Sequence, residues 1–144
     1  MRILNNWIDE FVELTNHLPS PLLFRKWAGI SAIAGVLERK VWVRTMNMEL
    51  YPNLYVVLTG PPGVGKTVAT SLVEDLWRAI PGLPVAPKSV TKPSLIDALT
   101  DAKRSKVYID GNQSSHLNYN SLLLNAGESG VTQWTSDRFS TVDS

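Results

Sequence analysis

The stretch Gly60-Pro61-Pro62-Gly63-Val64-Gly65-Lys66-Thr67 decides how this chain is interpreted, because it matches the phosphate-binding pattern G-x-x-x-x-G-K-[ST] in full. Before it, residues 54–59 read Leu-Tyr-Val-Val-Leu-Thr, an apolar and β-branched run that predicts a buried parallel strand. After it, apolar residues recur at four-residue spacing and predict a helix: Val68, Leu72, Leu76 and Ile80. Strand, loop and helix therefore follow in the order that the motif requires.

The residue types of this octet suit the binding of a triphosphate. Gly63 and Gly65 reach backbone angles that strain other residues, and they let consecutive N–H groups converge on an anion. The helix that begins near Gly65 adds the positive end of its dipole. We expect Lys66 to reach the β- and γ-phosphates, in a catalytic role, and the Thr67 hydroxyl to ligate Mg²⁺. The residues predicted to bind ATP are Gly60, Pro61, Pro62, Gly63, Val64, Gly65, Lys66, Thr67 and Val68.

The composition is that of one soluble domain. The chain has 144 residues, of which 44% are hydrophobic and 19% charged. It contains no run of about eighteen apolar residues, and its start lacks the pattern of a secretory signal, so we expect a cytoplasmic protein without a membrane partner. The absence of cysteine excludes disulfides and thiolate metal sites. The formal net charge of +1 neither favours nor excludes nucleic acid as a partner.

Residues 1–47 are expected to form a small helical region. Apolar residues at helical spacing predict an amphipathic helix over residues 5–18. Ser20 and Pro21 have the pattern of an N-cap followed by a first-turn proline, and they predict a second helix that ends near Arg39. A brief strand is predicted at residues 41–44.

Residues 48–144 are expected to form the nucleotide-binding core. Thr91-Lys92-Pro93-Ser94 predicts the start of a further helix, with a cap and a first-turn proline. The polar residues 111–120 are predicted to connect two strands. The predicted strands of the core are residues 54–59, 85–90, 107–109 and 121–124. This alternation of strands and helices predicts an α/β fold, a P-loop NTPase-type parallel sheet with flanking helices.

Two acidic residues are candidates for the second half of a hydrolytic site, which needs a carboxylate at the end of a neighbouring strand. Asp110 directly follows the predicted strand 107–109, where it would serve as a ligand of Mg²⁺. The dipeptide Asp110-Gly111 is also a common hairpin turn, which leaves a purely structural role open. Glu128 follows the predicted strand 121–124 by a few residues, where loops of an open sheet meet their ligand. A solvated turn is the alternative for Glu128.

Three further segments carry a resemblance to a known family. They are residues 24–35, which read Phe-Arg-Lys-Trp-Ala-Gly-Ile-Ser-Ala-Ile-Ala-Gly, residues 51–58, which read Tyr-Pro-Asn-Leu-Tyr-Val-Val-Leu, and residues 89–95, which read Ser-Val-Thr-Lys-Pro-Ser-Leu. Together with the octet, they resemble the amino-terminal part of phage- and plasmid-borne P-loop ATPases that are similar to RecA-like replicative helicases and primase-helicases. The resemblance spans most of the chain. Its specificity comes from the first two segments, because many ATPases share the loop.

The resemblance implies a RecA-like core and a role for Glu128. In such proteins a strand similar to residues 121–124 leads to an acidic residue that assists catalysis or the metal, which ranks Glu128 above Asp110. The resemblance also implies a homo-oligomeric ring that acts on single-stranded DNA during replication. Because such cores commonly have more strands after the acidic one, we expect the core to be incomplete at the carboxyl end of this chain.

Three functions are compatible with these features. The first is an ATP-hydrolysing motor that resembles a replicative helicase, or its amino-terminal part. The second is a nucleotide-dependent binding module that holds ATP without turnover. The third is a small-molecule kinase, which we rank lower because such enzymes need an arginine-rich closing lid and only Arg138 follows Lys106 in this sequence.

Overall fold

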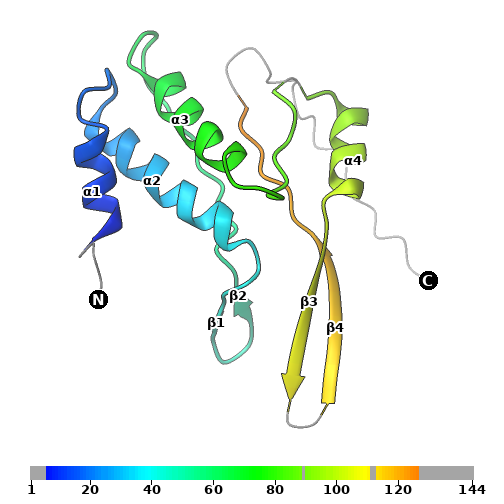
Figure 1. Ribbon diagram of the computed structural model, residues 1–144. Coiled ribbons are helices and arrows are strands. Elements are labelled where there is room, and N and C mark those ends of the chain that lie inside the picture. The colour runs from blue at the N-terminus through cyan, green and yellow to red at the C-terminus, as the bar shows by residue number, and fades with distance from the viewer. Residues whose placement is uncertain (1–5, 89, 111–112, 127–144) are drawn as a thin grey trace.

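The computed structural model of the chain describes residues 6–88, 90–110 and 113–126. Within these ranges the elements follow in the order α1, α2, β1, β2, α3, α4, β3 and β4 (Figure 1). The helices α1, α2 and α3 lie together on one side of the molecule, and the long hairpin β3–β4 extends away from them (Figure 1).

Helix α1 (Trp7–Leu14) is shorter than the predicted helix over residues 5–18. The Asn6 side chain caps it by accepting from the Ile8 N–H at 3.1 Å. At its other end Thr15 is the C-cap, and its buried hydroxyl donates to the Phe11 carbonyl at 2.8 Å, an acceptor that it shares with the Thr15 N–H at 3.1 Å. The helix therefore ends before residue 18, where the sequence predicts its end.

Helix α2 (Leu22–Leu37) begins one residue later than predicted, and the N-cap expected at Ser20 is wrong. The N-cap is Pro21, which has no side-chain capping bond. The Ser20 hydroxyl oxygen is instead buried without a hydrogen-bond partner, and the Ser20 carbonyl accepts from Arg25 Nε at 3.1 Å. A contact with an arginine on α2 thus replaces the cap.

Helix α3 (Lys66–Arg78) packs against α2 and forms the core with it. Gly35 permits the close approach, because a Cβ at this position would lie 2.7 Å from Trp77 Nε1. The Trp77 indole donates to the Ala32 carbonyl at 3.1 Å. The buried apolar cluster combines α1, α2 and α3 and consists of Phe11, Ala28, Ala32, Ala69, Val73 and Trp77. It joins helices from both sides of residue 48, where the sequence places the boundary between the regions 1–47 and 48–144.

The segment between α2 and α3 holds one short hairpin and no further strand within the described chain. Strands β1 (Val43–Arg44) and β2 (Glu49–Leu50) pair antiparallel, which places the brief predicted strand 41–44 in this hairpin. The predicted strand over residues 54–59 is not formed. An apolar run becomes a strand only where a neighbour accepts its N–H and C=O groups, and no described segment pairs with this one.

Helix α4 (Lys92–Asp101) confirms the cap that the sequence predicts. Thr91 is the N-cap, and its hydroxyl accepts from the Ser94 N–H at 3.4 Å, while Ser94 Oγ accepts from the Thr91 N–H at 2.8 Å. This reciprocal capping box satisfies two main-chain donors of the first turn.

Strands β3 (Lys103–Asp110) and β4 (Gln113–Asn120) form an antiparallel hairpin in which Asp110 lies opposite Gln113. The predicted strand 107–109 is confirmed as part of β3. The prediction that residues 111–120 form a connection is wrong for its described part, because these residues are the partner strand. The polar residues of β4 lack the apolar pattern of a strand, but β4 pairs with β3 through the main chain along its whole length.

One parallel contact links two of the segments that the sequence predicts as core strands. Val85 and Leu123 form a parallel bridge, in which the Ala86 N–H donates to the Leu123 carbonyl at 2.8 Å and the Leu123 N–H donates to the Pro84 carbonyl at 2.9 Å. Across the described ranges the sheets themselves are the two antiparallel hairpins, so the parallel sheet stays a prediction. None of the described helices is both long enough and apolar enough to cross a bilayer.

Candidate nucleotide-binding site

The predicted phosphate-binding loop leads directly into α3, and its glycines have the backbone angles that the motif requires. Gly63 has φ +76° and Gly65, the N-cap of α3, has φ +87°. Both angles lie in the left-handed region that favours glycine. No side chain caps α3, and the Thr67 and Val68 N–H groups have no hydrogen-bond partner among the described residues. These donors are available to an anion at the start of the helix.

Lys66 lies back across the loop. Its Nζ donates to the Gly60 carbonyl at 2.8 Å and to the Pro61 carbonyl at 3.0 Å. These carbonyls are neutral acceptors, and the oxygens of a phosphate are stronger ones for an ammonium group. Lys66 is thus held over the loop by contacts that a phosphate ligand would replace.

The loop is open to solvent. Gly60, Pro61, Pro62, Gly63 and Thr67 are exposed, whereas Val64, Gly65, Lys66 and Val68 are half-buried. A Cβ added at Gly63 would meet no atom within 4 Å. The geometry therefore leaves space at the middle of the loop and an exposed hydroxyl at Thr67.

The turn between α1 and α2 supports the other side of the loop, a contact that the sequence did not reveal. A Cβ at Gly65 would overlap the Pro19 carbonyl oxygen and lie 2.8 Å from Ser20 Cα. The Phe24 ring lies 3.6 Å from the Cβ position of Gly60. Ser20-Pro21 signals only the start of a helix, and nothing in a single sequence relates that start to a glycine more than forty residues later.

Asp110 is not brought to the loop. It ends β3 at the turn of the long hairpin, which lies at the opposite end of the view from the start of α3 (Figure 1). Two points that are well separated in a projection are at least as far apart in space. Among the described residues, Thr67 is therefore the one predicted magnesium ligand beside the loop.

Glu128 lies outside the described residues, but the chain that leads to it runs beside α3. Asn125 Nδ2 donates to the Thr70 carbonyl at 3.3 Å and to Glu74 Oε2 at 2.8 Å. Thr70 is one helical turn from Thr67.

Glu74 holds Asn125 beside α3. Its carboxylate accepts from Arg78 Nε at 2.8 Å, within an ion pair, and from Asn125 Nδ2 at 2.8 Å. Burial by itself raises the pKa of Glu74, but the hydrogen bonds from Asn125 and Arg78 outweigh this effect and lower the pKa below its ordinary value. Glu74 is therefore a charged structural group that ties residues 121–125 to α3.

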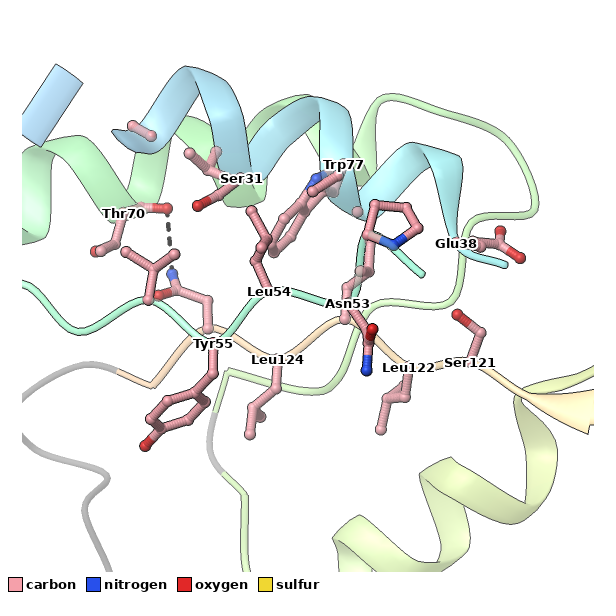
Figure 2. A pocket seen from close by; sticks show the side chains of 18 of the residues that line it. Ser31, Glu38, Asn53, Leu54, Tyr55, Thr70, Trp77, Ser121, Leu122 and Leu124 are labelled. Carbon is pink, nitrogen blue, oxygen red and sulfur yellow. Dashed lines mark hydrogen bonds between the residues drawn. The ribbon is translucent and has the colours of Figure 1, made fainter. Parts of the chain in front are cut away.

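A cavity of about 740 Å³ lies below the helices (Figure 2). Its walls are the inner faces of α2 and α3 and the segments 51–56 and 120–125, which include two of the predicted core strands. Figure 2 shows Leu54 pointing toward the helices, while Tyr55, Leu122 and Leu124 point away from them. The cavity thus separates α2 and α3 from two segments that the sequence predicts as strands.

The described residues fit a phosphate group better than a metal ion. Two glycines with positive φ, two uncommitted main-chain donors and one ammonium group form a set that binds an anion. The described ranges contain no group of three or more His, Cys, Asp or Glu side chains that could hold a metal ion. Comparison with known proteins finds no family model, no curated protein and no solved structure that matches the chain.

Proposed function

We propose that this protein binds Mg·ATP at residues 60–68 and hydrolyses it. The single observation that carries the proposal is the start of α3 at Lys66, directly after two glycines with positive φ and without a side-chain cap. This arrangement supports phosphate binding, because main-chain donors and the positive end of the helix dipole lie at the start of α3, in the same segment as the Lys66 ammonium group.

Each residue has a distinct role in the proposal. Lys66 exchanges the Gly60 and Pro61 carbonyls for oxygens of the β- and γ-phosphates, and Thr67 ligates Mg²⁺. Glu128 accepts a proton from the water that attacks the γ-phosphorus, while the bond to the β–γ bridging oxygen breaks and ADP and phosphate separate. The magnesium ion itself would supply charge neutralisation on the phosphate oxygens.

We further propose a motor on single-stranded DNA that works as a homo-oligomeric ring in the cytoplasm, with a P-loop NTPase core. The support for this finer proposal is the family resemblance of residues 24–35 and 51–58. The role of Glu128 in the proposal rests on the same family resemblance.

A binding module without turnover is the second candidate. The position of Asp110 at the far turn of the β3–β4 hairpin favours it, because one expected magnesium ligand is then missing from the neighbourhood of the loop. A nucleotide held by Lys66 and the main chain alone would bind without being hydrolysed.

Phosphate release from ATP by the full chain, with and without single-stranded DNA, separates the two candidates. Glu128→Gln should retain Mg·ATP binding and lose turnover, and Asp110→Asn is the matched carboxylate-to-amide control, which should retain both. Turnover that survives in Glu128→Gln and disappears in Asp110→Asn would transfer the role to Asp110. A wild-type chain that binds Mg·ATP without releasing phosphate would establish the binding module.

A further inference from the structure

We propose that Arg25 is a positioning residue for the phosphate-binding loop, and that it acts through the turn between α1 and α2. This inference rests on the proposed function as far as nucleotide affinity is concerned. Two contacts link Arg25 to the loop. Arg25 binds the turn, and the turn lies against Gly65, the N-cap of α3.

The first contact is an arginine buried in neutral surroundings. Arg25 is only 7% exposed, and its acceptors are the Val12 carbonyl at 2.7 Å, the Ser20 carbonyl at 3.1 Å and Asn16 Oδ1 at 3.4 Å. None of these acceptors carries a charge. A buried cation is costly unless its donors are satisfied, so this arrangement is stable only while the chain from residue 12 to residue 20 keeps its course.

The planar guanidinium group determines that course. It donates at once to the last turn of α1, to the following turn and to the residue before Pro21, so the three acceptors are held in one geometry. The Ser20 N–H donates to the Leu18 carbonyl at 2.8 Å, which makes the turn tight. Arg25 thus holds the Ser20–Pro21 peptide, which is joined through Ser20 to the Pro19–Ser20 peptide.

The second contact joins this peptide to the loop. Pro19 and Ser20 lie against Gly65 so closely that the position of Gly65 leaves no room for a side chain. The turn and the loop lie at the same end of the helices (Figure 1). Because Gly65 is the N-cap of α3, any shift of the Pro19–Ser20 peptide changes the direction of the N–H groups of the first turn.

The alternative is that Arg25 only stabilises the helical region. A merely structural role would change the free energy of unfolding and leave the affinity of the folded protein for Mg·ATP unaltered. A positioning role changes the affinity and the exchange of the loop amides under conditions in which the protein stays folded.

The experiment compares Arg25→Ala, Arg25→Lys and Arg78→Ala in the full chain. Arg78→Ala is the control, because it removes another helical arginine, which donates to the Ala86 carbonyl at 2.7 Å and pairs with Glu74 at the far end of α3 from the loop. Two quantities are measured on protein that circular dichroism shows to be folded: the Kd for Mg·ATP, by titration calorimetry, and the hydrogen exchange of residues 60–68.

Arg25→Ala should weaken the affinity for Mg·ATP about ten-fold or more and speed exchange in residues 60–68, whereas Arg78→Ala should change neither. Arg25→Lys should give an intermediate loss, since an ammonium group cannot hold three divergent acceptors in one plane. Equal effects of Arg25→Ala and Arg78→Ala on both quantities would overturn the proposal. If the wild-type chain binds no Mg·ATP, the proposed function fails, and the exchange data alone decide: faster exchange in Arg25→Ala upholds the positioning role, and unchanged exchange refutes it.

Discussion

At the scale of single residues, two glycines of the loop have different constraints. Gly63 needs its positive φ but has free space around it, whereas Gly65 has a positive φ and also faces the Pro19 carbonyl. The motif in the sequence correctly predicts that both positions need glycine. It does not predict that one of them also serves as a contact for a distant turn, because that contact depends on packing.

The substitution Gly65→Ala should therefore destabilise the protein more than a glycine-to-alanine substitution that causes backbone strain without a steric overlap. Gly82→Ala is the control, since Gly82 has φ +75° and no atom near its Cβ position. We expect about 1 kcal/mol for the control and about 2–4 kcal/mol for Gly65→Ala, measured by urea unfolding. Equal losses of unfolding free energy in both variants would show that the overlap with Pro19 adds nothing to the destabilisation.

The carboxylate of Glu74 gives the protein a stability that depends on pH. Its pKa in the folded state is lowered from 4.5, so the unfolded state binds the proton more readily. This contribution is complete above about pH 4.5 and is lost as the pH falls through the lowered value. We expect the free energy of unfolding of Glu74→Gln to change less steeply than that of the wild type below pH 4.5. If the free energy of unfolding has the same pH dependence in both proteins, Glu74 does not make this contribution.

At the scale of elements, local signals in the sequence predict the helices well and the strands poorly. Helices α2, α3 and α4 lie close to where apolar spacing places them, because a helix satisfies its main-chain groups internally, although the cap predicted for α2 is wrong. The strand predicted at residues 54–59 is not formed, and β4 forms in a polar stretch, because a strand depends on a partner that its own residues do not specify.

The two predicted helix caps provide a test at this scale. Thr91 caps α4 through a reciprocal pair with Ser94, whereas Ser20 does not cap α2 and its hydroxyl is buried without a partner. Thr91→Ala should lower the free energy of unfolding by about 1 kcal/mol, and Ser20→Ala should be neutral or stabilising. Thermal unfolding of both variants decides, and a larger loss for Ser20→Ala would restore its assignment as a cap.

At the scale of the whole molecule, one core joins the amino-terminal helices to the helix that follows the phosphate-binding loop. Phe11, Ala32 and Trp77 belong to the same buried cluster. The sequence predicts the candidate site as a local unit, since its octet is contiguous, and it predicts the helix that follows the loop, whereas the strand predicted before the loop is not formed. The relation of this unit to the turn at Pro19, to Asn125 and to the hairpin at Asp110 could not be predicted, because each involves residues far apart in the chain.

One parallel bridge, between Val85 and Leu123, links two of the segments predicted as core strands. The cavity beneath α2 and α3 is lined by residues 54–56 and 121–125, which belong in large part to two predicted strands. Across the described residues the parallel sheet therefore stays a prediction.

Titration of the full chain with Mg·ATP by calorimetry tests the central claim most directly, with Lys66→Ala beside the wild type and the exposed-lysine variant Lys92→Ala as control. The wild type and Lys92→Ala should bind one nucleotide per chain with the same affinity. Lys66→Ala should lose about two orders of magnitude in affinity or more, because the ammonium group held by Gly60 and Pro61 is the cation that we propose for the phosphates. Equal affinity in all three proteins, or no binding by the wild type, would contradict the assignment of residues 60–68 as a nucleotide site.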